Sequence, residues 1–151
     1  MDLKTAGLFA ILIMLLAGCG QTGSKGVSKN PITRYVANNN GDTAIATIEM
    51  LSPATFKGIL EIRYRGAYKD SGNIRGVVRG DTMIGDYNFQ HYGLPKWDRN
   101  PLTLLKRADR LIMGEGMVMY TVGIPHYNPN TPINYDESKR FVFFKDTISA
   151  K

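Results

Sequence analysis

Few side chains in this 151-residue sequence are of the types that carry covalent or metal chemistry. There is one cysteine, Cys19, and there are two histidines, His91 and His126. Neither histidine has a second ligand at a spacing such as His-x-x-x-His, and a site built from both would need further ligands such as Asp98 or Asp136. We therefore expect no metal site.

A catalytic arrangement is also not apparent. The sequence lacks a G-x-S-x-G motif, and its serines fall in tether or turn contexts. Asp81 and Asp86 are five residues apart on a predicted strand, which puts them on opposite faces and excludes an acid–base pair. The sequence therefore predicts a non-enzymatic protein with no catalytic residues and no cofactor.

Cys19 lies in the stretch LAGCG, directly after an apolar run over 6–16. That run is too short for a membrane-spanning helix, which needs about 20 apolar residues. Lys4 precedes it, and the small residues Ala17 and Gly18 follow, as at a signal-peptide cleavage site. The pattern predicts a signal peptide over 1–18. An ordinary secretory signal with an incidental cysteine is the alternative interpretation.

The order Leu-Ala-Gly-Cys resembles the bacterial lipobox, whose cysteine is lipid-modified and becomes the first residue of the mature protein. The resemblance implies a covalent lipid anchor on Cys19, which would hold the protein at a membrane. Two or more acyl chains anchor stably, at about 0.8 kcal/mol per buried CH₂. Lipidation would also explain why an exported protein carries one unpaired thiol.

The residues after Cys19 are rich in Gly, Ser, Lys and Asn, which predicts a lipidated N-terminus and flexible tether over 19–42. The formal net charge is +6. Export removes nucleic acid as a partner, so the charge either keeps the surface soluble or faces anionic headgroups. Bacteroidota-type surface lipoproteins often carry an acidic export signal just after the lipidated cysteine, and the stretch GQTGSKG has none. The lipobox resemblance therefore implies the periplasmic face of the bacterial outer membrane.

The remainder, 43–151, reads as strands separated by Gly, Pro, Asp and Asn clusters. In the segment 56–64, charged residues alternate with Leu60, Ile62 and Tyr64, the period of a half-buried strand. We predict an all-β fold, an antiparallel up-and-down meander forming a closed or half-open barrel. The expected strands are 44–51, 56–64, 73–79, 82–89, 102–107, 111–122 and 140–148.

The stretch YRGAYKDSGNIRGVVRGDTMIGDYNFQHYG resembles small Bacteroidota outer-membrane lipoproteins. In these, a Tyr-rich strand leads through Lys-Asp-x-Gly-x-Ile-x-Gly into Gly-Asp-Thr and then Asp-Tyr-x-Phe. The resemblance covers roughly 56–120 and lapses in the proline-rich loop near 123–138. It implies a lipocalin-like or open β-barrel domain and supplies no catalytic residues.

Three further features of the sequence have competing interpretations. Arg79-Gly80-Asp81 spells an integrin-recognition tripeptide, but Gly80-Asp81 is more typical of a two-residue hairpin turn. Alternation on the predicted strand 111–122 puts a methionine-rich set on one face, which would either line a ligand-binding lumen or pack in the core. That set comprises Met113, Glu115, Met117 and Met119.

The third feature is a group of aromatic and histidine side chains in the longer loops: Tyr68, His91, Tyr92, Trp97, His126, Tyr127 and Tyr135. In a meander, alternate connections share an end, so these loops should form one rim. The first predicted strand starts there, so the tether should leave from the same side. The rim would rest on headgroups or form the mouth of a pocket, or the aromatics are incidental.

Two functions are consistent with these observations. One is an interaction or envelope-maintenance role, in which the partner is an envelope protein. The other is a binding module for a small apolar or aromatic-stacking ligand held in the barrel. A filled barrel interior would favour the first, and a cavity large enough for a ligand would favour the second.

Overall fold

The computed structural model describes residues 30–66 and 68–147, so Cys19 and the predicted signal peptide lie outside the described residues. Eight antiparallel strands form a closed barrel in the order β1-β10-β7-β6-β5-β4-β3-β2. This confirms the predicted all-β meander barrel. The barrel strands are β1 (Ile32–Asn39), β2 (Asp42–Ser52), β3 (Thr55–Arg63), β4 (Lys69–Arg79), β5 (Thr82–Gln90), β6 (Trp97–Arg107), β7 (Arg110–Met113) and β10 (Val142–Lys145).

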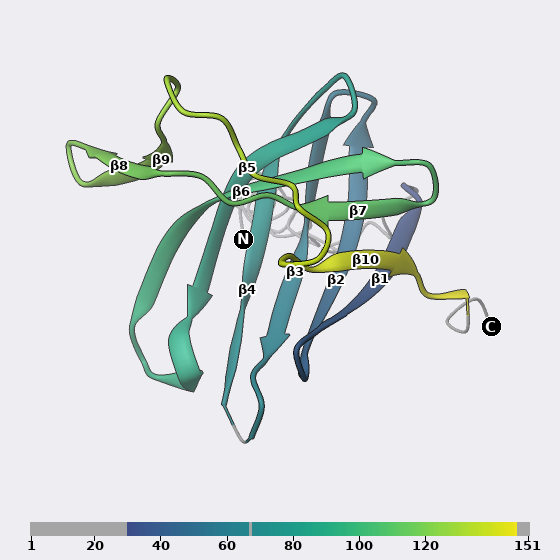
Figure 1. Cartoon of the computed structure of the whole chain (residues 1–151), viewed down its shortest axis with the longest axis horizontal. Helices are drawn as coiled ribbons and strands as arrows, with labels where there is room; N and C mark the ends of the chain where they lie inside the picture. The colour runs from purple at the N-terminus through teal and green to yellow at the C-terminus, as the bar shows by residue number, and fades with distance from the viewer. Residues whose placement is uncertain (1–29, 67, 148–151) are drawn as a thin grey trace, which may run out of the picture.

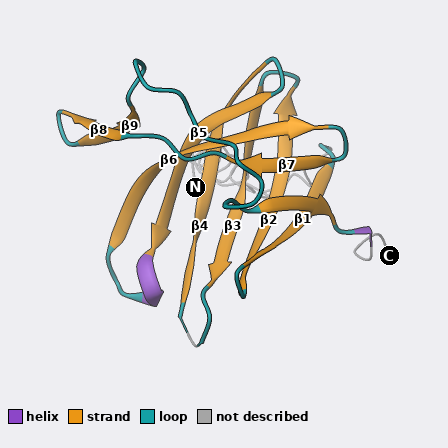
Figure 2. Ribbon diagram, viewed as in Figure 1, coloured by secondary structure: helices purple, strands orange, loops and turns teal. Residues whose placement is uncertain are grey.

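Two further strands, β8 (Val118–Thr121) and β9 (Ile124–Tyr127), form a separate hairpin beside the barrel (Figure 1). A single helical turn, η1 (His91–Gly93), lies at the corner between β5 and β6 (Figure 2). The described residues contain no helix long and apolar enough to cross a membrane.

The barrel has two ends that differ in their connections. The β2–β3, β4–β5 and β6–β7 turns lie at one end, where β1 begins and β10 finishes; we call this the closed end. The β1–β2, β3–β4 and β5–β6 connections lie at the other, the open end, and the segment 114–141 leaves the barrel after β7 and returns to it at β10. In Figure 1 the β2–β3 and β4–β5 hairpins are at the top and the β1–β2 turn is at the bottom.

Alternation along the strands places apolar side chains inside the barrel. Phe56, Ile74, Leu104 and Phe143 are almost completely buried and belong to one core cluster. Each fully buried side chain of this size contributes about 1.5–3 kcal/mol of transfer free energy. These residues come from β3, β4, β6 and β10, so the core ties strands from all around the barrel together.

Glycines let the β4–β5 pair bend sharply. Gly76 and Gly85 are directly paired across the two strands. A Cβ atom on Gly76 would lie 2.1 Å from the carbonyl oxygen of Ile84, and one on Gly85 would lie 2.0 Å from that of Arg75. Glycine at such positions allows the close backbone approach that a tightly coiled barrel requires.

The barrel begins earlier than the sequence analysis placed it. β1 lies within the segment predicted as tether, 19–42, and pairs with β2 along its whole length. The reason is the Asn40-Gly41 turn, in which both residues have positive φ (49° and 90°), as a two-residue type I′ hairpin requires. The polar composition around this turn is also typical of a flexible tether.

Because of the extra strand β1, the chain enters the barrel at the end opposite to the one predicted. β1 starts at Ile32, opposite Glu49 near the β2–β3 turn, and so at the closed end. The expectation that the tether leaves from the aromatic loops was therefore wrong. One missed strand moves the entry point to the opposite end, because each strand of a meander reverses direction.

The predicted strand 111–122 is two separate elements. β7 ends at Met113, and the chain then leaves the barrel to form the β8–β9 hairpin before returning as β10. The returning segment covers the outside of the barrel: the hydroxyls of Tyr135 and Thr103 are 2.7 Å apart, and Arg110 pairs with Glu137. Ile112 points outward, unlike Leu111 and Met113 beside it in β7, and is nevertheless fully buried.

Candidate functional site

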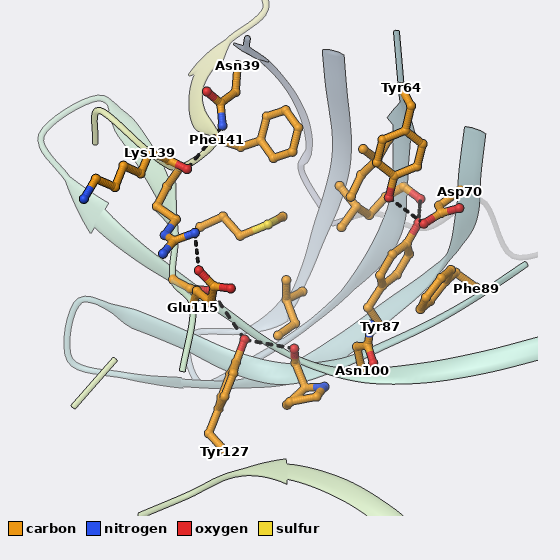
Figure 3. A pocket seen from close by; sticks show the side chains of 17 residues that line it. Asn39, Tyr64, Asp70, Tyr87, Phe89, Asn100, Glu115, Tyr127, Lys139 and Phe141 are labelled. Carbon is orange, nitrogen blue, oxygen red and sulfur yellow. Dashed lines mark hydrogen bonds and ion pairs between the residues drawn. The ribbon is translucent and has the colours of Figure 1, made fainter. Parts of the chain in front are cut away.

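The open half of the barrel contains a cavity of about 350 Å³ (Figure 3). Its apolar wall comes from inward-facing positions near the open end of the strands, among them Leu60, Ile62, Phe89 and Leu102. These four residues belong to the core cluster, and other members of it, among them Phe56 and Leu104, fill the closed half. The interior is therefore hollow at one end and packed at the other.

One wall of the cavity is organised around Asp70, a carboxylate with only 3% of its surface exposed. It accepts hydrogen bonds from the Tyr64 hydroxyl at 2.7 Å and from the Tyr92 backbone N–H at 3.1 Å. The Nδ1 atom of His91 lies 2.9 Å from the same carboxylate. Three partners compensate the cost of burying this group. Burial and the hydrogen bond to Asp70 raise the pKa of Tyr64 above its usual range.

Aromatic rings continue from this wall to the outer surface. Tyr92 is at the centre: its ring stacks on His91 at a centroid distance of 3.7 Å and contacts Tyr68 at 4.9 Å and Tyr64 at 5.6 Å. Its backbone has a φ of 54°, a conformation that costs energy for a residue other than glycine. The hydrogen bond from its N–H to Asp70 holds it there.

The opposite wall carries charged and polar groups. Glu115 forms an ion pair with Arg140, whose Nε is buried and has no hydrogen-bond partner in the described structure. Tyr127 donates a hydrogen bond to the carbonyl of Pro101 at 3.1 Å. Burial, followed by the nearby Tyr135 and Glu115, raises the pKa of Tyr127 to about 12. The cavity thus combines an apolar and aromatic body with hydrogen-bonding groups on both sides, as Figure 3 shows.

The structure brings most of the predicted rim residues to the open end. Tyr68, His91 and Tyr92 form the aromatic cluster just described. Trp97 begins β6 and lines a groove of about 550 Å³ that lies next to the cavity and includes Tyr120 and Pro125 of the β8–β9 hairpin. Tyr127 lines the cavity itself.

Two rim residues lie elsewhere. His126 is on the β8–β9 hairpin, where its Nε2 atom is 2.7 Å from the Thr121 hydroxyl. Tyr135 packs on the outside of β6 against Thr103. Both belong to the segment that leaves the barrel after β7, and the alternation of simple meander connections does not apply to that segment.

The methionine-rich set predicted to line a lumen is divided in the same way. Met113 and Glu115 line the cavity. Met117 and Met119 are on or beside the hairpin with 59% and 44% of their surface exposed. Because the predicted strand ends at Met113, its alternation does not continue beyond that residue.

The other sequence features have simple structural settings. Gly80-Asp81 is the two-residue turn between β4 and β5, and Gly80 has a φ of 57°, so the predicted hairpin turn is confirmed. Asp86 is bound by Arg99 through two hydrogen bonds. The described residues contain no cluster of three or more potential metal ligands, and His91 and His126 lie in different substructures.

Sequence reasoning missed Asp70 and Arg140. A signal for Asp70 was present, since Asp70, Gly72 and Ile74 occupy the inward positions of β4 and a carboxylate there interrupts an apolar face. No comparable signal marked Arg140, which lies between elements.

Comparison of the chain with family models, curated proteins and solved structures finds no match. Fold and geometry together define an eight-stranded antiparallel barrel with a cavity at one end.

Proposed function

We propose that this protein is a lipid-anchored, non-enzymatic binding module of the bacterial periplasm that holds a small ligand in the open half of its barrel. The observation that carries the proposal is the cavity of about 350 Å³ inside an otherwise packed barrel. Pockets for small molecules have volumes of roughly 300–1,000 Å³ and are mostly apolar with a few polar groups. This cavity meets both criteria.

The lining suggests the chemical character of the ligand. Leu60, Ile62 and Leu102 would contact an apolar body, and Tyr87 and Phe89, stacked at 4.5 Å, present aromatic surface. The Arg140–Glu115 pair is positioned to bind one polar group of the ligand. A compact aromatic or short-chain molecule with a single polar end would satisfy these contacts.

The rival proposal is an interaction or envelope-maintenance role without a small ligand. The β8–β9 hairpin supports this role. All residues of β8 are exposed, and the hairpin presents Tyr120, Val122 and Ile124 to solvent. Exposed apolar surface of this kind marks interaction sites in soluble proteins. The cavity favours the ligand-binding proposal, because an interaction protein does not need a hollow interior.

The experiment titrates the uncharged aromatic probe N-phenyl-1-naphthylamine into the protein and follows the fluorescence of the probe. A chain beginning at Gly20 serves here, because all barrel strands lie within residues 32–145. Met113→Trp should fill part of the cavity and weaken binding at least tenfold. Met119→Trp makes the same substitution on the exposed hairpin and should change binding less than twofold.

Two outcomes would contradict the ligand-binding proposal. One is the absence of saturable probe binding to the folded wild-type barrel. The other is an equal loss of binding in both tryptophan variants, which would locate the probe outside the cavity. Circular dichroism of each variant establishes that it is folded.

A further inference from the structure

Charges are distributed unevenly between the two ends of the barrel. In the open half of the described structure, cationic side chains are held by carboxylates or by backbone oxygens. The pairs are Arg63 and Lys69 with Glu61, Lys96 with Asp98, Arg99 with Asp86, Lys139 with Asp136, Arg140 with Glu115, and Arg65 with the carbonyl of Asn40. This half therefore has little uncompensated positive charge.

The closed end carries cations without such partners. The side chains of Arg79, Lys106, Arg107 and Lys145 are exposed and have no ion pair or hydrogen bond among the described residues. They lie in or beside the β4–β5 and β6–β7 turns and at the end of β10.

Two carboxylates, Asp81 and Asp109, lie in the turns of the closed end as well. They reduce the positive charge there but do not cancel it, because the unpaired cations outnumber them.

A small hollow lies among these cations. It has a volume of about 150 Å³ and is lined by Lys106, Arg110 and Lys145 together with Tyr35 and Asp109. Arg110 pairs with Glu137, and Asp109 offsets one of the two lysine charges, so the hollow keeps a net positive charge. A hollow of this size with two free ammonium groups at its edge matches a phosphate group in charge and size.

The chain also enters the barrel at this end. Ile32, the first residue of β1, pairs with Glu49 near the β2–β3 turn. The preceding sequence contains two more lysines, Lys25 and Lys29, and no acidic residue between Cys19 and Asn30. These lysines precede in sequence the strand that begins at the closed end.

We propose that the closed end is a docking surface for anionic lipid headgroups, with phosphate seated against Lys106 and Lys145. The field of a charged membrane falls off within a Debye length of about 10 Å. An 11-residue strand such as β4 is about 35 Å long, so only the near end of the barrel responds to that field. The open end, with its cavity, then faces away from the membrane.

The proposal does not depend on the cavity or on lipidation. Its test separates headgroup docking from ligand binding in the cavity and from lipidation of Cys19. The unlipidated chain beginning at Gly20 is mixed with vesicles of phosphatidylcholine alone or with about one-third phosphatidylglycerol, and bound protein is measured by sedimentation. Binding should require phosphatidylglycerol and should decrease steeply as the salt concentration is raised.

A charge-neutralised variant locates the contact. Lys106→Gln/Lys145→Gln should weaken binding to the anionic vesicles roughly 25-fold, since each basic residue near such a surface contributes about five-fold. Lys69→Gln/Lys96→Gln removes the same charge from the open end and should change vesicle binding less than twofold. Naphthylamine binding in the cavity should be unchanged by Lys106→Gln/Lys145→Gln.

Equal weakening by the two double variants would overturn the proposal, because it would show that net charge and not the closed end governs binding. Failure of the wild-type chain to bind anionic vesicles at low salt would overturn it as well.

Discussion

Asp70 is a buried carboxylate on which three parts of the open end converge. Its partners are Tyr64 after β3, His91 in η1 and the strained backbone of Tyr92. Because the side chain is almost fully buried, removing it would leave these donors without an acceptor. Asp70 therefore links the aromatic cluster to the barrel.

We expect Asp70→Ala to lower the free energy of unfolding by about 2–4 kcal/mol, measured by urea denaturation. Asp81→Ala is the matched control, because Asp81 lies in an exposed turn, and it should change stability by no more than about 0.5 kcal/mol. Equal effects of the two substitutions would show that the Asp70 hydrogen bonds do not stabilise the fold.

Tyr127 links the cavity to alkaline stability. Its pKa is raised to about 12 in the folded protein, whereas the unfolded chain has a tyrosine pKa of about 10. The protonated Tyr127 hydroxyl therefore adds to the free energy of unfolding. This added stability is fully present below pH 10 and is lost as the pH rises from about 10 to 12, because the unfolded chain releases the proton first.

We expect Tyr127→Phe to make the loss of unfolding free energy between pH 10 and 12 shallower, by at most about 1.4 kcal/mol per pH unit. Denaturant titrations at several pH values measure this slope. Tyr120→Phe removes the same hydroxyl from the exposed hairpin and is the control. An unchanged slope in Tyr127→Phe would show that burial of this hydroxyl does not affect alkaline stability.

At the level of elements, the β4–β5 pair depends on glycine for two different reasons. Gly85 needs the absence of a Cβ atom, because one would lie 2.0 Å from a backbone carbonyl oxygen. Gly80 needs positive φ in its turn and has open space around it. The first requirement concerns close approach of two strands, and the second concerns local backbone conformation.

These two causes predict different penalties. Gly80→Ala should cost about 1–2 kcal/mol, the ordinary cost of positive φ for a residue with a Cβ. Gly85→Ala should cost more, because the carbonyl of Arg75 belongs to the adjacent strand and cannot move without disturbing the ladder. Thermal melts of both variants measure the difference. A smaller effect at Gly85 would contradict the proposed close packing of this strand pair.

The β8–β9 hairpin contrasts with the barrel strands. It packs near β6 through Tyr127 and encloses the groove beside Trp97, yet most of its side chains face solvent. Its turn contains Val122 at a φ of 49°, an unusual conformation for a β-branched residue. An isolated two-stranded hairpin is marginally stable in water, so the contacts with β6 hold it in place.

At the level of the whole molecule, the proposed anchor and the proposed docking surface act on the same end. Lipid on Cys19 would keep the protein at the membrane, and the basic closed end would orient it with the cavity facing the aqueous compartment. Anchoring and orientation are separate contributions, so each can be removed without the other.

We expect labelled palmitate supplied to cells to appear in this protein in the membrane fraction and to disappear in Cys19→Ala. The mature protein should lack residues 1–18, which mass spectrometry of its N-terminus measures. Lys106→Gln/Lys145→Gln should keep the label, because lipidation does not require the closed end. Unlabelled wild-type protein in the soluble fraction would contradict the anchor.

The local structure of most of the barrel follows from the amino-acid sequence. Strands such as β3 and β5 were predictable because a half-buried strand imposes a two-residue period on its side chains. The β4–β5 turn was predictable because only a few residue pairs fit a two-residue hairpin. Asn40-Gly41 is also a residue pair that fits a two-residue hairpin, but the polar residues around it are typical of a tether, so β1 was not predicted.

The closure of the barrel and the position of its cavity depend on tertiary contacts. Closure pairs Tyr35 with Lys145, far apart in the chain, and that register depends on every intervening turn. The cavity depends on how side chains from several strands fill a shared volume, and the burial of Asp70 depends on loops that pack over it. These are non-local properties, and a repeating local pattern cannot specify them.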